Sequence, residues 1–304
     1  MFFKKAPDEI SLYYYKCDNA GDILNETLIP DLFGIKVLQE SFETSDMIAV
    51  GSVLERIVKG SNAGWTNEKL QKTADKSKTI IVWGTGFMYG YDDFSEMKFV
   101  RPADIRAVRG ELSRKACEKI IGGKLNCVTA DPGLLAPFLL DKMPEKKYEL
   151  GIIPHFREYE NEEYLNLFKN INSKCENSVI IDLSENLTDV LTKIASCETV
   201  ISTSLHGLIF SDAFGIPSMW CEMTDIILGG GYKYRDYYSC YGIEAEPFDL
   251  KCTGFPSVDE IRKNYKVSYG DVLKKQKQLI KCFPYHNKKT RLILKSIRHC
   301  GLGK

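Results

Sequence analysis

Short runs of apolar residues alternate along the chain with stretches in which apolar residues recur at helical spacing. The apolar runs cover residues 11–15, 47–50, 79–83, 107–109, 150–154, 178–182, 199–202 and 218–220. Runs of this length predict buried strands, and the stretches between them predict crossover helices, so the pattern favours an α/β fold with parallel sheets. Several runs end in small or polar residues. Because ligands gather at the carboxyl ends of parallel strands, we expect the functional residues there.

A charged, proline-containing segment at residues 141–147 divides the chain almost evenly. A chain of 304 residues is long enough for two domains that each bury a core. We therefore expect two Rossmann-like domains facing a cleft, at residues 1–145 and 146–250. Residues 251–304 are expected to form a basic helical tail that crosses back to the first domain.

The composition fits a folded globular protein, with 44% hydrophobic and 27% charged residues. The ten cysteines are scattered without a CxxC pair, which is typical of free thiols in a reducing cytoplasm. None of the four histidines has a cysteine at zinc-binding spacing, so no metal is expected. The chain lacks the apolar region of a signal peptide and the roughly 18 apolar residues that span a bilayer, so we expect a cytoplasmic protein.

The zero net charge hides a basic tail. Residues 272–304 carry ten Lys or Arg and no Asp or Glu. One interpretation is a solvated helical face whose other side, formed by Leu292, Ile293, Leu294 and Ile297, packs on the body. A second, compatible interpretation is attraction to the anionic inner face of the cytoplasmic membrane, at about 1 kcal/mol for each basic residue. We favour the first.

His206 is the strongest candidate for chemistry. It follows a buried strand and Ser204, and it opens a helix that ends near Gly215 and Pro217. A helix N-terminus favours an anion, and histidine titrates near neutrality. The alternative is a buried histidine bonded to a backbone carbonyl. Its place at a strand end favours an active-site residue beside an anionic substrate.

Two further strand ends carry polar residues. Arg109 ends an apolar run and offers a planar fork for carboxylate or phosphate, unless it is a surface residue paired with Glu111 or Asp104. Asp131 precedes Pro132 and is predicted to cap the next helix rather than to act in chemistry.

Two turns offer polar groups for a cleft. The first contains Asn19, Asp22 and Asn25 and presents polar groups to a ligand, unless it is an ordinary turn between a strand and a helix. The second joins glycines 229–231 to a strip with Lys233, Arg235 and Asp236, which suits a sugar or phosphate. A plain loop before a packed helix is equally compatible with this second pattern.

No nucleotide fingerprint is present. The turn with Thr85 and Gly86 lacks the third glycine of a GxGxxG motif, and there is no Walker A lysine. These absences argue against hydride transfer and against phosphoryl transfer driven by ATP. Nothing in the sequence indicates binding of nucleic acid.

Five segments in order resemble the polysaccharide pyruvyl transferase family. They are the turn at 19–25, the glycines at 84–86, the segment 108–113, the turn at 131–135, and the segment from Ser204 to Pro217. The resemblance implies two Rossmann-like domains arranged as in GT-B glycosyltransferases. It also implies transfer of the enolpyruvyl group of phosphoenolpyruvate onto two sugar hydroxyls, forming a ketal and releasing phosphate, with phosphoenolpyruvate as co-substrate and no other cofactor.

The resemblance assigns roles by position. It implies that His206 is the general acid, that Arg109 grips the donor, and that Leu205 contacts the donor through its backbone. Family members often carry arginine where this chain has Ser204, so Lys233, Arg235 and Arg157 are the candidates for a second donor-binding cation. The expected donor-binding residues are Arg109, Ser204, Leu205, His206, Gly207 and Lys233. The expected cleft residues are Asn19, Asp22, Asn25, Thr85, Gly86, His155, Arg157, Arg235 and Asp236.

Two other functions fit the same pattern. One is a GT-B-type glycosyltransferase that uses a nucleotide sugar, and the other is a non-catalytic glycan-binding subunit of a polysaccharide assembly complex. The expected acceptor is a hexose in a capsular or exopolysaccharide precursor, carried on a lipid. No motif selects one hexose over another.

Overall fold

The computed structural model describes residues 6–16, 19–62, 73–252 and 254–300. Cys17 and Asp18, next to the predicted turn, and residues 301–304 of the predicted tail lie outside the described residues. The strands are β1 (Glu9–Tyr13), β2 (Lys36–Gln39), β3 (Met47–Ile48), β4 (Val58–Lys59), β5 (Ile80–Trp83), β6 (Lys98–Phe99), β7 (Ala103–Val108), β8 (Val128–Thr129), β9 (Tyr148–Ile153), β10 (Ser178–Ile180), β11 (Cys197–Ser202), β12 (Ser218–Glu222) and β13 (Phe248–Asp249). The helices are α1 (Ala20–Phe33), η1 (Leu54–Ile57), α3 (Glu111–Ile121), η2 (Pro132–Leu139), α4 (Phe156–Tyr159), α5 (Glu162–Ser173), α6 (Leu187–Ala195), α7 (Leu205–Ala213), α8 (Tyr232–Ser239), α9 (Val258–Asn264), α10 (Tyr269–Cys282) and α11 (Lys288–Cys300).

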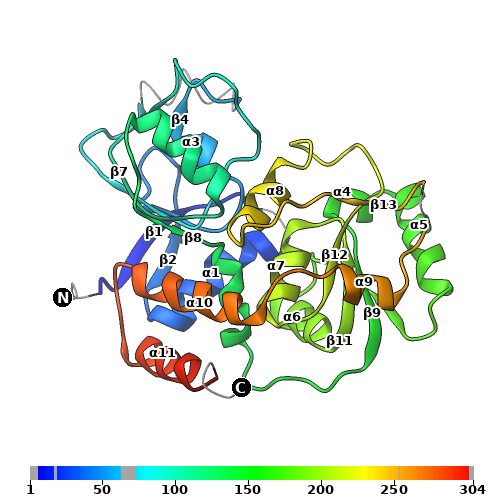
Figure 1. Cartoon of the computed structure of the whole chain (residues 1–304). Coiled ribbons are helices and arrows are strands. Elements are labelled where there is room, and N and C mark those ends of the chain that lie inside the picture. The colour runs from blue at the N-terminus through cyan, green and yellow to red at the C-terminus, as the bar shows by residue number, and fades with distance from the viewer. Residues whose placement is uncertain (1–5, 17–18, 63–72, 253, 301–304) are drawn as a thin grey trace.

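Two parallel sheets organise the protein (Figure 1). The first contains six strands in the order β2-β1-β3-β5-β7-β8, and the second contains five in the order β10-β9-β11-β12-β13. The strands β4 and β6 form a separate antiparallel pair. Every apolar run identified in the sequence overlaps one of the parallel strands, so the predicted α/β fold with parallel sheets is confirmed.

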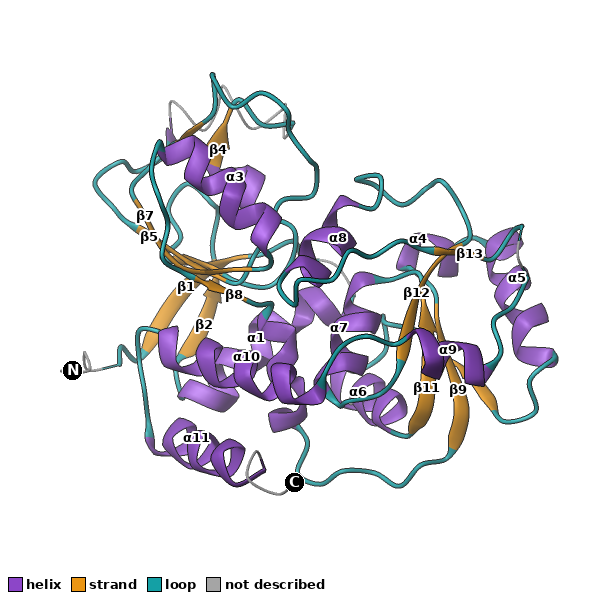
Figure 2. Cartoon of the chain, in the orientation of Figure 1, coloured by secondary structure: helices purple, strands orange, loops and turns teal. Residues whose placement is uncertain are grey.

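Helices fill the space between the two sheets (Figure 2). The helix η2 packs against both α1 and α7 there. Their buried residues form one hydrophobic core with strands of both sheets, because Leu12 of β1, Leu24 of α1 and Val200 of β11 belong to the same cluster. Asp131 caps η2 as predicted, since its carboxylate accepts a hydrogen bond from the Gly133 N–H at 2.8 Å.

The C-terminal helices pack on the first half of the chain (Figure 1). In α10, the Leu279 carbonyl accepts a hydrogen bond from the indole of Trp83 at 3.2 Å. Directly after α10, Phe283 stacks on Phe33 of α1 with ring centroids 3.7 Å apart. Before α11, the Asn287 amide donates to the carbonyl of Leu32 at 3.0 Å. The last two helices and the segment between them therefore hold the C-terminal end of α1.

The helix α11 buries one face and exposes the other. Ile297 is buried and Ile293 and Leu294 are partly buried, as predicted for the packed face, but Leu292 is 56% exposed, so the prediction is wrong for that residue. Leu292 shares the exposed face with Lys288, Lys289, Arg291 and Lys295. Contact of this face with an anionic membrane stays a prediction. Among the described residues, no helix combines the length and the apolar character needed to cross a bilayer.

A buried ion pair joins the two halves. The Nε and Nη2 atoms of Arg109 both lie 2.9 Å from Oδ2 of Asp236 on α8, and both side chains are 0% exposed. The same guanidinium donates to the Ser52 hydroxyl at 2.5 Å and to the carbonyl of Phe87. Each carboxylate and guanidinium edge thus has a partner, which a buried pair requires to offset its loss of hydration.

The helix α8 also caps α3, which belongs to the first half. The Ser113 N–H donates to Oδ1 of Asp236 at 2.8 Å, and the Glu111 N–H donates to the Ser239 hydroxyl at 2.8 Å. These bonds satisfy N–H groups that the first turn of a helix leaves unpaired. A Cβ atom on Gly110 would lie 1.7 Å from the Asp236 carbonyl oxygen, so glycine permits this approach. The segment 108–113 is therefore an interface between the halves.

Breaking this ion pair should destabilise the protein. Asp236→Leu leaves Arg109 buried and uncompensated, and we expect a loss of about 3–5 kcal/mol in the free energy of unfolding, measured with urea. The double variant Arg109→Met/Asp236→Leu should recover part of that loss, because no charge then stays buried. The matched control is Arg235→Met, because Arg235 lies on the same helix as Asp236 and forms an exposed ion pair with Glu246. This substitution should cost less than about 1 kcal/mol. An unchanged urea midpoint for Asp236→Leu would contradict the assignment.

Candidate functional site

A pocket of about 410 Å³ lies where residues after β1, β3, β9 and β11 meet the start of α8. Its volume is in the usual range for small-molecule sites. Its lining contains eight of the predicted site residues: Asn19, Asp22, His155, Arg157, Ser204, Leu205, His206 and Lys233. The remaining lining residues are Tyr13, Tyr15, Gly51, Ser52, Val53, Arg56, Met88, Phe156 and Leu228. Both halves of the chain therefore contribute to one pocket.

His206 sits in the first turn of α7, and its ring packs against the first turn of α1. A Cβ atom on Gly21 would lie 2.0 Å from Nδ1 of His206, so only a glycine at this position leaves space for the ring. The Asn19 side chain caps α1 by accepting from the Gly21 N–H at 3.0 Å, which holds this turn in place. The predicted turn at 19–25 thus supports His206 directly.

The N-terminus of α7 faces the pocket without a side-chain cap. Ser204 is its N-cap residue, but the Ser204 side chain makes no capping bond. The Ser204 N–H instead donates to the Ser202 hydroxyl at 2.9 Å, which shapes the turn after β11. Backbone N–H groups in the first turn of a helix attract an anion. The start of α7 therefore offers a binding site for an anionic group beside His206.

Positive charge is crowded in the pocket. Burial, with Arg109 and Arg157 nearby, lowers the pKa of Lys233 to about 7, while Asp22 and Glu158 oppose that shift. Lys233 lies over the ring of Tyr234 at 5.2 Å, and no described carboxylate forms an ion pair with it. Burial and then Lys233 and Arg109 lower the pKa of His206 to about 3. At neutral pH these pKa values give a neutral His206 and a partly protonated Lys233.

His155 is held by the pocket wall. The ring Nδ1 of His155 accepts a hydrogen bond from the backbone N–H of Arg157 at 3.3 Å. The backbone N–H of His155 donates to the Thr203 hydroxyl at 2.8 Å. Burial and then Lys233 and Arg157 lower the pKa of His155 to about 3. Because Nδ1 is an acceptor, the neutral ring carries its proton on Nε2.

A buried carboxylate supports this wall from behind. Glu158 is 0% exposed and accepts hydrogen bonds from the hydroxyls of Thr203 and of Thr224, the latter at 2.6 Å. The Tyr234 hydroxyl donates to the Thr203 carbonyl at 2.5 Å. Thr203 directly precedes Ser204, so these bonds fix the turn that carries His206.

Several predicted site residues lie outside the pocket lining. Arg109 and Asp236 bind each other behind Ser52, and Arg235 pairs with Glu246 at 2.6 Å on the other side of α8. Of the three candidate cations, Lys233 and Arg157 line the pocket and Arg235 does not. Direct binding of the donor by Arg109 stays a prediction. In this structure its guanidinium contacts Asp236, Ser52 and the carbonyl of Phe87.

Four other predicted residues shape the pocket without lining it. Asn25 bonds both the N–H and the carbonyl of Val50, at 3.0 and 3.3 Å. Thr85 donates to the Gly51 carbonyl at 2.7 Å, so the wall segment at 51–53 is held from two sides. Gly86 packs against Arg109, and Gly207 packs against Ser202, since a Cβ atom on either would lie within 2.6 Å of those side chains.

Sequence reasoning missed part of the lining. Gly51 and Ser52 directly follow the predicted strand at 47–50, so the strand-end rule alone indicates them. Tyr15 lies at the end of the first predicted strand and carries the same signal, whereas Tyr13 lies in the middle of that strand. Arg56 lies in the short helix η1 and Met88 in a loop, and no sequence pattern marks either.

Comparison with known proteins shows the family of the chain. The family model for polysaccharide pyruvyl transferase matches residues 3–225, and the chain belongs to that family. The chain is 27% identical over 252 residues to "Uncharacterized protein L143" of Acanthamoeba polyphaga mimivirus, covering 81% of this chain and 79% of that protein. It is also 27% identical over 240 residues to "Succinoglycan biosynthesis protein ExoV" of Rhizobium meliloti (strain 1021), covering 77% of this chain and 66% of that protein.

The contact between Gly21 and His206 gives a test of the site's geometry. Alanine is favoured over glycine in helices, by up to about 1 kcal/mol in a helix interior, and Gly21 lies in the first turn of α1. We expect Gly21→Ala to do the opposite, because its Cβ atom would displace the imidazole of His206. Urea unfolding and the imidazole NMR signals of His206 measure the two effects. The control is Gly123→Ala, where nothing lies within 4 Å of the added atom. A stabilised Gly21→Ala protein with unchanged His206 signals would refute this packing.

Proposed function

We propose that this protein transfers the enolpyruvyl group of phosphoenolpyruvate onto two hydroxyls of a hexose in a polysaccharide precursor. The observation that carries the proposal is the pocket that Arg56, Arg157 and Lys233 line together with His206, with Asp22 as the one acidic residue among the described residues of the lining. Such a pocket suits a small molecule with several negative charges. Family membership and the succinoglycan relative support the same reaction class.

The donor has a phosphate and a carboxylate, and the pocket offers cations for both. In the proposed complex, Arg157 and Lys233 supply the positive charge that family members draw from an arginine at the position of Ser204. The uncapped start of α7 adds N–H donors beside them. The two Rossmann-like parts, at 1–145 and 146–250 with the tail at 251–304, then face each other as in GT-B enzymes, and donor and acceptor meet between them.

Binding of the donor prepares His206 for catalysis. The empty pocket keeps the pKa of His206 at about 3, so its ring is neutral at pH 7. A bound ligand with several negative charges reverses the effect of Lys233 and Arg109 and favours the imidazolium. His206 therefore acquires its catalytic proton when the donor is present, which limits wasteful protonation in the empty enzyme.

The proposed reaction balances with the groups present. His206 protonates the methylene carbon of phosphoenolpyruvate, and the first sugar hydroxyl forms a C–O bond to the resulting cationic carbon. The proton of this hydroxyl returns to His206. The C–O bond to phosphate then breaks, the second hydroxyl closes the ketal ring, and its proton leaves with the phosphate. The cations of the pocket stabilise the departing phosphate.

Incubation with phosphoenolpyruvate and a panel of hexosides tests this proposal. We expect inorganic phosphate and a hexoside carrying a pyruvate ketal, detected by mass. His206→Gln should lower the rate by roughly 10²–10⁴-fold, which is typical for the loss of a positioned general acid. His286→Gln, outside the pocket lining, should retain activity. Full transfer by His206→Gln would sink the assignment. Nucleotide release from a sugar nucleotide would favour a glycosyltransferase, and binding without turnover of any donor would favour a non-catalytic subunit.

The pKa of Lys233 predicts how donor binding depends on pH. The pKa is about 7 in the empty pocket, and a bound anion raises it, so binding above pH 7 takes up a proton. The dissociation constant for phosphoenolpyruvate should rise above pH 7, and proton uptake by Lys233 should contribute up to about tenfold per pH unit to that rise. Calorimetric titrations should show that Lys233→Met removes this contribution and leaves the slope that comes from proton uptake by His206. Arg157→Met should weaken binding but keep the slope, because arginine does not titrate there. A flat profile for the wild-type protein would contradict the prediction.

A further inference from the structure

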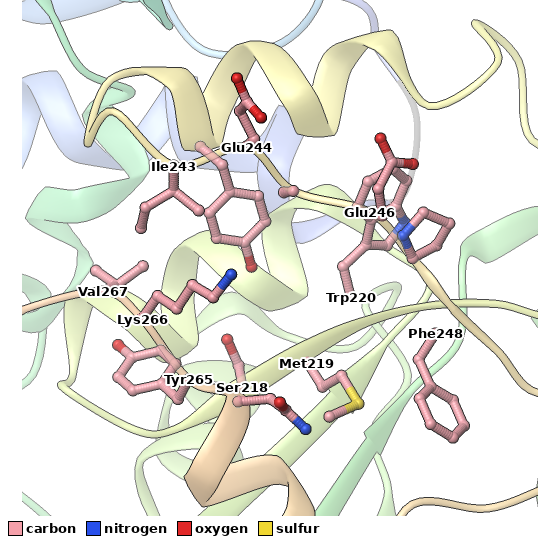
Figure 3. Close-up of a pocket in the computed structure, with 14 residues that line it drawn as sticks. Ser218, Met219, Trp220, Ile243, Glu244, Glu246, Phe248, Tyr265, Lys266 and Val267 are labelled. Atoms are coloured by element: carbon pink, nitrogen blue, oxygen red, sulfur yellow. The ribbon is translucent and has the colours of Figure 1, made fainter.

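A second pocket, of about 450 Å³, lies beside β12 on the second sheet (Figure 3). Its floor contains Trp220 and Tyr238, which are buried. In Figure 3, Glu244 and Glu246 lie along one edge of the pocket, and the amine of Lys266 points into the space between them and Ser218. No residue lines both this pocket and the pocket that holds His206.

The floor of this second pocket is held by bonds from below. The Ser218 hydroxyl donates to the buried carboxyl group of Asp212 at 3.3 Å, and the Tyr237 hydroxyl donates to the same group at 2.8 Å. Trp220 stacks on Tyr234 with ring centroids 4.6 Å apart and planes 6° apart. Tyr234 is the residue that binds the Thr203 carbonyl in the wall of the first pocket. One layer of aromatic residues therefore separates the two pockets.

The charges of the two pockets differ. The first is lined by Arg56, Arg157 and Lys233 against Asp22. Among the described residues, the second is lined by Glu244, Glu246 and Lys266, with no arginine or histidine, and Glu246 is paired with Arg235 beside the pocket. This lining lacks the cluster of cations that phosphates, nucleotides or phosphoenolpyruvate would need for binding. The second pocket therefore suits a ligand without negative charge.

The shape and chemistry of the lining narrow the ligand further. Tyr265 is half-buried and gives the floor an aromatic surface, while Trp220 is covered by the ring of Tyr234 and the guanidinium of Arg235. At the rim, Glu244, Lys266 and Asn264 are exposed and offer acceptors and donors. A hexose combines an apolar ring face with hydroxyls that both donate and accept hydrogen bonds. Pockets with a mostly apolar floor and a few polar groups orient such ligands.

We propose that the second pocket binds a neutral hexose unit of a glycan, separately from the reaction at His206. The identification of that glycan as the acceptor rests on the proposed function, because a polymeric acceptor has sugars beyond the one that is modified. The site then holds the chain of the acceptor while its target sugar reacts in the first pocket.

The indole N–H signals of the protein test this inference. Trp220 Nε1 is buried without a partner among the described residues, whereas Trp83 Nε1 bonds Leu279 far from the pocket. The probes are methyl β-glucopyranoside and methyl β-galactopyranoside, titrated into the whole chain, with signals assigned by single Trp→Phe substitutions. We expect a saturable shift of the Trp220 signal with at least one hexoside and an unchanged Trp83 signal. Inorganic phosphate should not move the Trp220 signal.

Rim variants link that shift to the pocket. Lys266→Ala and Glu244→Ala should each weaken hexoside binding by roughly fivefold, as for the loss of one hydrogen bond. Lys263→Ala, an exposed lysine nearby that does not line the pocket, should leave it unchanged. No saturable Trp220 shift with either hexoside, or equal affinity of all three variants, would overturn the inference. Phosphate release from phosphoenolpyruvate is measured separately, so a failed transfer reaction leaves the binding result standing and a failed binding result leaves the reaction standing.

Discussion

The buried ion pair between Arg109 and Asp236 is the interaction on which the site's geometry depends. It connects the end of β7 in the first half with α8 in the second, away from water. The same helix carries Lys233 into the pocket and binds the turn before Ser204 through Tyr234. Because α8 also caps α3, its position is set by several bonds at once. Moving α8 away from β7 would be costly, because it would leave a buried charge with neither water nor its partner.

Glycines make this assembly possible by their small size. Gly110 lets α8 approach the start of α3, and Gly21 lets the ring of His206 lie on the first turn of α1. Neither glycine has a positive φ angle, so an ordinary backbone conformation is present at both sites. A side chain does not fit at either position because a neighbouring group occupies the space that its Cβ atom would need. The backbone conformation itself would allow other residues.

The described residues of the pocket include several cations, of which Lys233 is buried and Arg56 is half-buried. Lys233, His155 and His206 have lowered pKa values because burial and neighbouring cations disfavour their charged forms. An anionic ligand supplies the missing countercharge and at the same time raises these pKa values. The binding energy of the donor and the protonation of the acid are therefore coupled in the proposed reaction. The second pocket has no such crowding of cations, which separates the two kinds of ligand by charge.

Local sequence determined the strands, the caps and the position of His206. Apolar runs, Asn19 before α1, Asp131 before η2 and the strand end before His206 act within a few residues of one another, so their chemistry is readable from the chain. Family resemblance extended this to Lys233 and Arg157, which the structure places beside His206. The prediction is wrong for Leu292, because the helical pattern predicts an apolar stripe on α11 but not how much of that stripe the neighbouring helices cover.

Partnerships over long separations were decided only by the tertiary structure. Arg109 meets Asp236 across 127 residues, and the sequence alone suggested a ligand or a neighbouring acid for it instead. Arg56 and Met88 line the pocket because η1 and a loop are brought to it, not because of any local pattern. Gly21 and His206 are far apart in sequence and touch only after two helices pack. The physical reason is that charge pairing and close packing depend on distance in space, whereas strand formation and capping depend on neighbours along the chain.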